Sequence, residues 1–422
     1  MDKLVIEGQI PLRGEVVVSG AKNAALPIMA AALLTTDECI IDNVPIVEDV
    51  RTLAEILRQV GCTVHLEPAS HRVIIRAPEA DELNPVVPSD LARRMRASFL
   101  LAGPLLARAG RVTAPHPGGC SIGRRPVNVD IKGFSAMGAS VELSDSQYHL
   151  EAKRLRGERI YLDYPSHTGT ENILMAATLA EGTTVIKHAS VEPEVADLAE
   201  CLRQMGARVS GVGTSYLHIE GVDRLHGVHY RVTPDRIEAG TYAIAAAITG
   251  GDITIHDIVP DHLDPLTHKL LEAGVLVEVE DRAYRVRGNG TLHAVELQTL
   301  HYPGFPTDLQ AEFATLLTQS HGTSFVHERV FDDRFQYARE LRKLGACIQV
   351  DGQTATIIGP TRLHGAVVEA LDIRSGAALI LAGLAAEGVT EIHSIYHIDR
   401  GYENIDGKLR ALGAHVKRVT VS

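Results

Sequence analysis

The sequence predicts an α/β protein of two domains, each built from three repeated modules with buried helices and outer sheets. A helix-like stretch ends in Gly before a short strand-like run six times, roughly seventy residues apart, at Gly61, Gly138, Gly206, Gly274, Gly345 and Gly413. The chain has 422 residues, which exceeds the length over which a single hydrophobic core keeps growing. Three modules in each of two domains fits both observations.

Each module begins with a helical stretch that is apolar on almost every side, and a helix of this kind is buried on every side. The six stretches span residues 23–34, 91–106, 172–180, 237–249, 309–319 and 376–386. Later segments alternate apolar and polar residues, as at 149–152 and 284–287, which is typical of strands with one face in water. We therefore expect the sheets to cover the helices, the reverse of a doubly wound fold.

The N-terminal segment 4–18 also alternates like strands but has no helices of its own. We expect it to complete the last module, near the C-terminus. The first domain then spans residues 22–232, and the second combines 1–21 with 233–422. The chain would cross between the domains twice, and the two crossings would form a narrow double hinge.

The composition argues against several classes of partner. The net charge is −12 and no block of consecutive Lys or Arg occurs, so a surface for nucleic acid is not expected. Aromatic residues make up 4% of the chain and Trp is absent, which leaves little surface for stacking bases. Apolar runs are too short to span a bilayer, and the N-terminus lacks the features of a signal peptide. We expect a cytoplasmic protein without a membrane partner, and nothing indicates an obligate protein partner.

The five cysteines are odd in number, scattered and without a C-x-x-C pair, so neither a disulfide framework nor a zinc site is expected. Cys120 differs from the others because it lies in a Pro- and Gly-rich loop, where we expect it to be exposed. A bystander thiol is one interpretation, but the adjacent Arg124 and Arg125 would favour a reactive thiolate. The other four are interpreted as core residues: Cys39, Cys62, Cys201 and Cys347.

Polar residues that appear in only one module are the candidates for chemistry, and they gather at predicted helix starts. Helix N-termini present unpaired N–H groups that hold anions. The residues at first-helix starts are Lys22, Asn23, Arg96, Asp308 and Arg374, and those at second-helix starts are Arg125, Arg334 and Arg400. An isolated Arg beside acidic neighbours is usually a surface ion pair, and Lys22 is equally well a solvated residue of a capped helix. If these cations converge, they form a positive site for a small, strongly anionic ligand.

Acidic candidates leave two interpretations open. Asp308 is either a first-turn carboxylate that favours the helix dipole or a base that acts on a substrate hydroxyl. Other acidic positions are interpreted as ion pairs that fix helices or the hinge: Glu192, Glu194, Asp235 and Glu238.

Several segments together resemble the enolpyruvyl transferase family, and within it the UDP-N-acetylglucosamine 1-carboxyvinyltransferases. They are SGAKNA at 19–24, MRAS at 95–98, PGGC at 117–120, FPTD at 305–308 and YHIDRGYE at 396–403, and the similarity extends over essentially the whole chain. The resemblance implies two inside-out α/β barrels with the active site in a cleft between them. It also implies transfer of the enolpyruvyl group of phosphoenolpyruvate to the 3-hydroxyl of UDP-N-acetylglucosamine, with release of phosphate, at the first committed step of peptidoglycan precursor synthesis.

The same resemblance implies roles for single residues. Cys120 would protonate the methylene carbon of phosphoenolpyruvate and would be alkylated by fosfomycin, and Asp308 would take the proton of the sugar hydroxyl. Residues expected to hold the phosphate are Lys22, Arg125 and Arg400; Arg334 and Arg374 would bear on the carboxylate. Other expected contacts to bound substrates are Asn23, Arg96, Pro126, Val127, Asn128, Val129 and Val330. No metal or organic cofactor is implied.

The chain departs from the family pattern at two places near the expected nucleotide-sugar pocket. Asn128 stands where many relatives have Asp, and Ser166-His167-Thr168-Gly169 replaces Ser-Val-Gly-Ala. Two alternative functions are weighed against the main one. The first is 3-phosphoshikimate 1-carboxyvinyltransferase, which lacks the PGGC loop, and the second is a non-catalytic regulator that binds a UDP-sugar.

Overall fold

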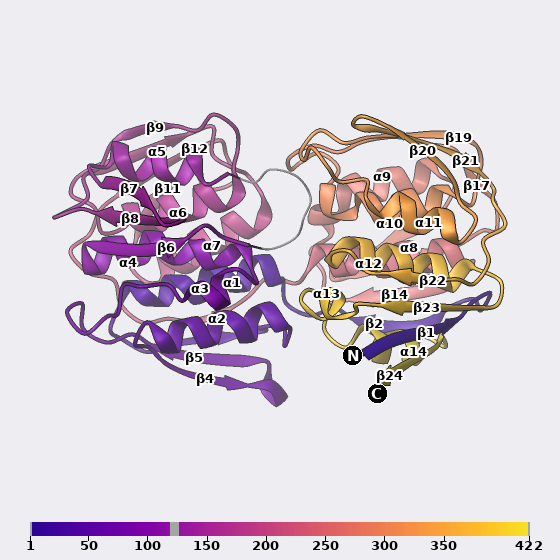
Figure 1. The fold of residues 1–422 in the computed structure, drawn as a ribbon, viewed down its shortest axis with the longest axis horizontal. Helices are drawn as coiled ribbons and strands as arrows, with labels where there is room; N and C mark the ends of the chain where they lie inside the picture. Colours follow the sequence, from indigo (N-terminus) through magenta and orange to yellow (C-terminus); the bar gives the residue numbers. More distant parts are fainter. Residues whose placement is uncertain (1, 119–125, 421–422) are drawn as a thin grey trace. The chain divides into compact units, whose positions relative to one another are not determined.

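The computed structural model describes residues 2–118 and 126–420, which separate into two compact units (Figure 1). The first unit contains residues 20–118 and 126–233, and the second contains residues 2–19 and 234–420. Within the first unit, Ala21 N–H donates to the carbonyl of Thr233 at 2.7 Å. Within the second, Asp235 N–H donates to the carbonyl of Ser19 at 2.9 Å. In each unit, the two segments at which the chain enters and leaves the unit are therefore joined by a backbone hydrogen bond.

The six predicted helix ends are confirmed. All six glycines have positive φ angles between 87° and 108°, a region that favours Gly because it has no Cβ. The helices that end before them are α2 (Glu48–Gln59), α5 (Asn128–Ala136), α7 (Pro193–Gln204), α9 (Asp264–Glu272), α11 (Tyr337–Lys343) and α14 (Ile405–Ala411). A strand follows each glycine within two residues.

The first unit contains three separate sheets. Their strand orders are β13-β3-β5-β4, β6-β8-β7 and β11-β12-β10-β9. The strands are β3 (Cys39–Asp42), β4 (Thr63–Glu67), β5 (Arg72–Arg76), β6 (Arg111–Pro115), β7 (Ser140–Ser144), β8 (Gln147–Glu151), β9 (Arg159–Tyr161), β10 (Thr183–Lys187), β11 (Arg208–Ser210), β12 (Tyr216–Glu220) and β13 (His229–Arg231).

The second unit also contains three sheets. Their orders are β15-β16-β14-β2, β17-β19-β21-β20 with β18 beside β19, and β22-β23-β1-β24. The strands are β1 (Asp2–Glu7), β2 (Arg13–Val17), β14 (Asp252–His256), β15 (Leu276–Val279), β16 (Ala283–Arg287), β17 (Leu292–His293), β18 (Glu296–Gln298), β19 (Ser320–His327), β20 (Cys347–Asp351), β21 (Thr354–Gly359), β22 (Val367–Glu369), β23 (Val389–His393) and β24 (His415–Thr420). Within the described residues, none of the six sheets closes on itself.

The N-terminal segment contributes to two sheets rather than one. β1 pairs with β23 and β24, as expected for a segment that completes the last module. β2, however, pairs in parallel with β14, in a different sheet of the second unit. The expectation that all of segment 4–18 joins the last module is therefore wrong for β2. The sequence pattern of a strand does not say which edge it joins.

The apolar helices lie at the centre of each unit. Every residue of α12 (Ile373–Ala385) is buried, as are all residues of α1 (Lys22–Ala31) except Asn23. In Figure 1, helices α8 (Arg236–Thr249), α10 (Gln310–Leu317) and α12 lie between strands β19–β21 and strands β14 and β23. Strands such as β12 and β16 alternate buried residues with more exposed ones, so one face of each sheet contacts the helices.

One predicted helix is interrupted. Residues 91–106 form α3 (Ser89–Ala92), the 3₁₀ helix η3 (Arg96–Leu101) and α4 (Ala102–Ala109). Pro104 explains part of this break, because a proline has no N–H for the helical ladder and its ring clashes with the carbonyl four residues earlier. The other helical elements are α6 (His167–Ala177), α13 (Tyr396–Asp399), η1 (Ala32–Leu34), η2 (Pro68–Ser70), η4 (Pro260–Leu263) and η5 (Thr307–Leu309).

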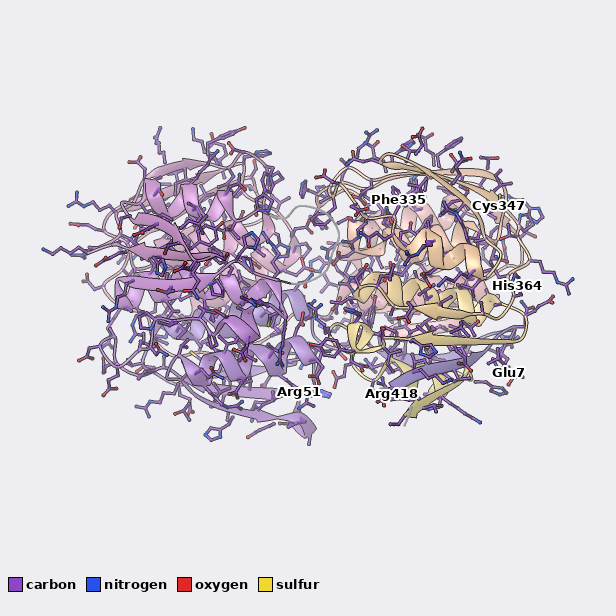
Figure 2. All side chains as sticks on the ribbon, viewed as in Figure 1. Glu7, Arg51, Phe335, Cys347, His364 and Arg418 are labelled. Atoms are coloured by element: carbon purple, nitrogen blue, oxygen red, sulfur yellow. The ribbon has the colours of Figure 1, made fainter. Side chains whose placement is uncertain are left out.

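The cysteines confirm the sequence interpretation at three positions and correct it at one. Cys39, Cys62 and Cys201 are buried, and burial raises the pKa of all three thiols. Cys347 is exposed rather than part of the core (Figure 2). It begins β20, an edge strand, and the alternation of that strand buries the neighbouring Ile348 instead. Cys120 lies outside the described residues.

Candidate active site

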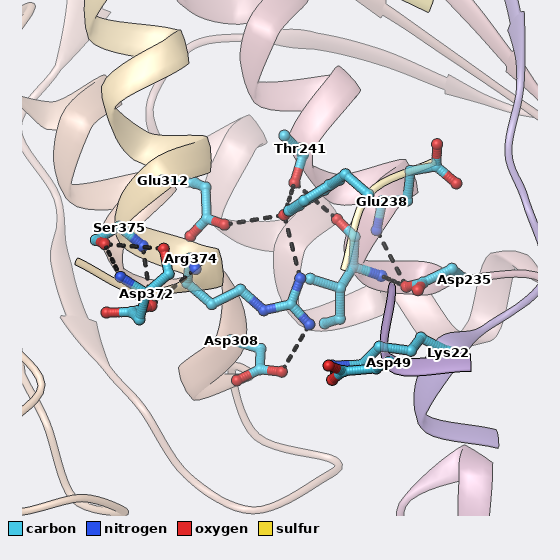
Figure 3. Close-up of polar contacts among 12 residues, drawn as sticks. Lys22, Asp49, Asp235, Glu238, Thr241, Asp308, Glu312, Asp372, Arg374 and Ser375 are labelled. Atoms are coloured by element: carbon cyan, nitrogen blue, oxygen red, sulfur yellow. Dashed lines mark hydrogen bonds and ion pairs between the residues drawn. The ribbon is translucent and has the colours of Figure 1, made fainter. Parts of the chain in front are cut away.

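Asp308 lies in the second unit, on η5 at the start of α10, and contacts two buried guanidinium groups. Its Oδ1 accepts a hydrogen bond from Arg334 Nη2 at 2.9 Å. Its Oδ2 accepts one from Arg374 Nη2, also at 2.9 Å (Figure 3). The two arginine side chains are 4% and 7% exposed, whereas the Asp308 side chain is 29% exposed. The fold thus brings three sequence-predicted residues together, with the carboxylate as the most accessible member.

Arg374 is oriented by the start of α12. Asp372 Oδ1 accepts hydrogen bonds from the backbone N–H groups of Arg374 and Ser375, and Ser375 Oγ accepts one from Asp372 N–H. This capping box satisfies N–H groups that a helix start otherwise leaves unpaired. Arg374 Nη1 also donates to Tyr402 Oη at 3.2 Å, and its guanidinium lies 5.5 Å from the centroid of that ring. The cap and the ring together direct the side chain at Asp308.

A fully buried carboxyl group, that of Glu312 on α10, also contacts the hydroxyl of Tyr402. Glu312 Oε1 is 3.2 Å from Tyr402 Oη, which is also 2.8 Å from Thr241 Oγ1 of α8 (Figure 3). Burial raises the pKa of Glu312 to about 8, although the positive charge of Arg374 opposes this rise. Asp308 is therefore linked through Arg374 and Tyr402 to a second acidic group.

Another buried glutamate, Glu328, holds the loop that contains Val330. Glu328 Oε1 accepts hydrogen bonds from the backbone N–H groups of Val330 at 2.7 Å and Phe331 at 3.1 Å. Its Oε2 accepts one from Thr307 Oγ1 at 2.9 Å. Thr307 immediately precedes Asp308, so Glu328 fixes the loop of Val330 to the segment that carries Asp308.

Arg400 is buried at the C-terminal end of α13 in the same unit. This helix also carries His397, whose Nδ1 is buried and has no hydrogen-bond partner among the described residues. Burial, and then the charge of Arg400, lower the pKa of His397. A neutral imidazole therefore lies near a permanent cation.

In the first unit, Lys22 is the first residue of α1 and is 9% exposed. Its Nζ lies 3.4 Å from Asp49 Oδ2, on the first turn of α2, and Asp49 is also buried (Figure 3). Asn23 follows on α1 and is half-buried. Lys22 is therefore not a solvated surface lysine, and the alternative interpretation given above is wrong.

The segment around α5 brings together further predicted residues of the first unit. Arg96, the first residue of η3, donates from Nη2 to the carbonyl of Pro126 at 3.0 Å. Val127 is the N-cap of α5, which begins with Asn128 and Val129. Asn128 Oδ1 is buried and has no hydrogen-bond partner among the described residues. Arg96 and residues 126–129 thus form one cluster.

Asp130 is the third residue of the same helix and is buried. Its Oδ1 accepts a hydrogen bond from Asn172 Nδ2 at 2.8 Å. The amide of Asn172 also bridges the carbonyl of Phe99 at 2.9 Å and the N–H of Gly103 at 2.8 Å. Burial raises the pKa of Asp130 to about 6, while Asn172 and then Arg96 oppose the rise.

The unusual segment 166–169 forms the start of α6. Ser166 Oγ accepts a hydrogen bond from Gly169 N–H at 3.1 Å and so caps the helix. His167 Nε2 lies 3.1 Å from Glu171 Oε1, one turn later, and the Glu171 side chain is 1% exposed. Burial lowers the pKa of His167, but the charge and hydrogen bond of Glu171 outweigh it and raise the pKa to about 9. His167 and Glu171 therefore form an ion pair at this helix start.

Two predicted site residues, Cys120 and Arg125, lie outside the described residues. Within the described ranges, no group of three or more His, Cys, Asp or Glu side chains is arranged to hold a metal ion. None of the helices described is both long and apolar enough to cross a membrane. Among the acidic positions interpreted as ion pairs, Glu238 is confirmed, since Lys408 Nζ lies 2.6 Å from its Oε1.

Sequence reasoning did not identify the partners that orient the predicted residues: Asp49, Asp130, Asn172, Thr241, Glu312, Glu328 and Tyr402. One signal was available for Glu312, Asn172 and Thr241. Each is a polar residue inside a helix predicted to be buried on every side, and such a residue requires a partner. Which partner it finds depends on packing between helices that are distant in sequence.

Comparison with known proteins identifies relatives along the full chain. Residues 6–409 match the sequence model of the family described as EPSP synthase (3-phosphoshikimate 1-carboxyvinyltransferase). UDP-N-acetylglucosamine 1-carboxyvinyltransferase 2 of Carboxydothermus hydrogenoformans is 49% identical over 422 residues, and the match covers 100% of both chains. UDP-N-acetylglucosamine 1-carboxyvinyltransferase 1 of Caldanaerobacter subterraneus subsp. tengcongensis is 46% identical over 416 residues, 99% of each chain.

Solved structures with similar folds are also enolpyruvyl transferases. The enolpyruvyl transferase NikO from Streptomyces tendae superposes with a TM-score of 0.90 and 28% identity, over 100% of this chain and 99% of that one. EPSP synthase from Acinetobacter baumannii superposes with a TM-score of 0.77 and 18% identity over all of both chains, a likeness that concerns the fold alone.

Proposed function

We propose a function from the premise that this chain belongs to the EPSP synthase family of enolpyruvyl transferases and is therefore a transferase. It transfers the enolpyruvyl group of phosphoenolpyruvate to the 3-hydroxyl of UDP-N-acetylglucosamine and releases phosphate, as a step of peptidoglycan precursor synthesis. The acceptor is supported by full-length relatives that bear that name at 46–49% identity. The observation that supports the chemistry is Asp308, a partly exposed carboxylate held between two buried guanidinium groups.

The proposed reaction is an addition followed by an elimination. Cys120 donates a proton to the methylene carbon of phosphoenolpyruvate, which makes the neighbouring carbon electrophilic. Asp308 accepts the proton of the sugar 3-hydroxyl, and the oxygen adds to that carbon. The tetrahedral intermediate then loses phosphate from this carbon, and the former methylene carbon returns a proton to the thiolate of Cys120, which restores the double bond.

Cations stabilise the negative charge at each stage of this reaction. Arg334 and Arg374 bear on the carboxylate of phosphoenolpyruvate, and both already hold Asp308. The residues proposed to hold the phosphate are Lys22, Arg125 and Arg400. Arg96, Asn23, Val330 and residues 126–129 are proposed to contact the bound substrates. At the two departures of this chain from its family, the His167–Glu171 pair and the buried Asn128 Oδ1 are the polar groups proposed to contact the nucleotide.

We further propose that the two units correspond to domains 22–232 and 1–21 with 233–422, and that substrates bind in a cleft between them. Each domain would be an inside-out α/β assembly of three modules. Three separate sheets and centrally buried helices in each unit support this arrangement. A cytoplasmic location and a reaction without metal or organic cofactor belong to the same proposal.

Phosphate release is the test of this function. The purified full-length protein is supplied with phosphoenolpyruvate and either UDP-N-acetylglucosamine or shikimate 3-phosphate, and phosphate is measured over time. We expect release only with the UDP-sugar. Release that depends on shikimate 3-phosphate would identify the alternative transferase, and binding of the UDP-sugar without release from either mixture would identify a regulator.

A further inference from the structure

The hydroxyl of Tyr402 is the meeting point of three side chains from three helices. It lies 3.2 Å from Arg374 Nη1, 2.8 Å from Thr241 Oγ1 and 3.2 Å from Glu312 Oε1. Tyr402 is 2% exposed, Thr241 3% and Glu312 0%. These contacts are therefore made inside the protein, where a polar contact that lacks a hydrogen is costly.

Counting hydrogens decides which group donates at each contact. The guanidinium of Arg374 supplies its own hydrogen to Tyr402 Oη. Three further contacts each require one: Thr241 Oγ1 to the carbonyl of Ile237 at 2.9 Å, Thr241 Oγ1 to Tyr402 Oη, and Tyr402 Oη to Glu312 Oε1. Thr241 and Tyr402 have one hydroxyl hydrogen each. All three contacts are hydrogen bonds only if the third hydrogen is on the carboxyl group of Glu312.

The second oxygen of Glu312 leads to the same assignment. Oε2 is buried and has no hydrogen-bond partner among the described residues. An ionised carboxylate would place negative charge on this unsolvated oxygen, whereas a neutral carboxyl group would not. The titratable groups that face Glu312 from the surrounding elements are Arg374, Arg334, Asp308, Tyr402 and Tyr337, and its pKa is raised to about 8 mainly by burial.

We propose that Glu312 is a positioning residue that holds a proton at neutral pH and donates it to Tyr402, which in turn fixes Arg374 on Asp308. With Glu312 neutral, the guanidiniums of Arg334 and Arg374 outnumber the carboxylate of Asp308, and the group retains a net positive charge. Ionisation of Glu312 cancels that charge and removes one hydrogen bond from Tyr402. In its effect on an anionic substrate, this inference rests on the proposed function.

Infrared spectroscopy tests the proton directly and without substrate. A protonated carboxyl group has a carbonyl stretch that a carboxylate lacks. We compare spectra at about pH 7 and about pH 9, on either side of the pKa of about 8. The full-length protein should lose one carboxyl band between these values, and the Glu312→Gln variant should lack that change. An unchanged difference spectrum in Glu312→Gln would overturn the proposal.

Glu340 provides a matched control for this experiment. It is also 0% exposed, but Lys343 Nζ lies 2.6 Å from its Oε2 and Arg339 Nε 3.3 Å from its Oε1. Because these cations favour the ionised form, Glu340→Gln should retain the band change of the wild type. Loss of the band change in Glu340→Gln, with its retention in Glu312→Gln, would show that Glu340 and not Glu312 carries the proton. That result would contradict the inference.

The pH profile of activity tests the coupling to Arg374. Between about pH 7 and about pH 9, the neutral fraction of a group with a pKa of about 8 falls about tenfold. In the wild type, kcat/KM for phosphoenolpyruvate should therefore decrease about tenfold over this range because Glu312 ionises. Glu312→Gln keeps a neutral hydrogen donor, and it should match the wild type at pH 7 and lack this part of the fall. Equal profiles in both proteins would overturn the coupling. The infrared result does not depend on turnover, so an inactive protein would refute the proposed function without affecting the assignment of the proton.

Discussion

The two units each contain a carboxyl group buried among helices, but they satisfy it in different ways. In the first unit, Asp130 accepts a hydrogen bond from the amide of Asn172, whose N–H groups can only donate. In the second, Glu312 contacts the hydroxyl of Tyr402, which donates or accepts. Burial raises the pKa of Asp130 to about 6 and that of Glu312 to about 8. A fixed donor thus keeps one carboxylate ionised at neutral pH, whereas an adaptable hydroxyl allows the other to keep its proton.

The largest expected effect concerns Asp308, the carboxylate connected through Arg374 and Tyr402 to Glu312. Asp308→Asn preserves the shape of the side chain but removes the base, so turnover should fall by about 10² to 10⁴-fold. Steady-state phosphate release measures this, with circular dichroism to show that the fold is intact. Asp252→Asn, which removes a more exposed ion pair with Arg285 in the same unit, is the control and should retain normal turnover. Near-normal turnover of Asp308→Asn would exclude its role as the base.

The next effect compares how much the contacts of Asn172 and those of the Tyr402 hydroxyl contribute to stability. Asn172→Ala leaves Asp130, the Gly103 N–H and the Phe99 carbonyl without their shared partner, and it should lower the free energy of unfolding by about 3 kcal/mol. Tyr402→Phe also removes the shared partner of three groups, Arg374 Nη1, Thr241 Oγ1 and Glu312 Oε1, and should cost about 3 kcal/mol as well. Urea unfolding followed by circular dichroism gives both values. A loss in Tyr402→Phe far below that in Asn172→Ala would contradict hydrogen bonds between the hydroxyl and all three groups.

Local features of the fold could be predicted from the sequence because single residues determine them. The six glycines mark helix ends because a positive φ is strained for other residues. The break within 91–106 and the pairing of β2 with β14 were missed. Pro104 accounts for part of the break and is visible in the sequence. The pairing of β2 depends on which segments meet in space, and periodicity does not contain that information.

The candidate site also combines residues that the sequence could indicate with residues that it could not. Asp308, Arg334 and Arg374 were predicted from their places at helix starts and from a family resemblance, and the fold brings them together. Glu312 and Tyr402 were not predicted as a pair. They are 90 residues apart, and neither has a local sequence pattern that indicates the other. The groups that adjust the charge of the site were therefore harder to predict than those that compose it.

A smaller effect distinguishes the two carboxyl groups by the pH dependence of stability. A carboxyl group whose pKa is raised in the folded state stabilises the fold most at low pH, because the unfolded chain releases its proton first as the pH rises. Glu312 has a pKa of about 8 against 4.5 when unperturbed, so its contribution should decrease across that window by at most about 1.4 kcal/mol per pH unit. For Asp130, the corresponding decrease in stability occurs between pH 3.8, its unperturbed pKa, and about pH 6, its pKa in the folded protein.

The measurement compares each neutral variant with the wild type at about pH 5 and about pH 7. Between these pH values, the free energy of unfolding of the wild type should fall by about 2 kcal/mol relative to Glu312→Gln. Relative to Asp130→Asn it should fall by only about 1 kcal/mol, because above about pH 6 Asp130 is ionised in both the folded and the unfolded state. Urea unfolding at both pH values supplies the four differences. A larger fall relative to Asp130→Asn would reverse the assignment of the proton-holding group.

The smallest effect tests a feature that the units share. Gly138 in the first unit and Gly413 in the second both have a φ of 95°, and a Cβ at either position meets nothing within 4 Å. Ala at each site should therefore cost only backbone strain, about 1 kcal/mol, and the two costs should be equal. Gly133→Ala is the contrasting variant, because its Cβ would lie 2.3 Å from Ile173 Cδ1 and would add a clash to any backbone effect. Unequal costs at Gly138 and Gly413, measured by urea unfolding, would show that the shared helix ends are not energetically equivalent, even though their backbone geometry is the same.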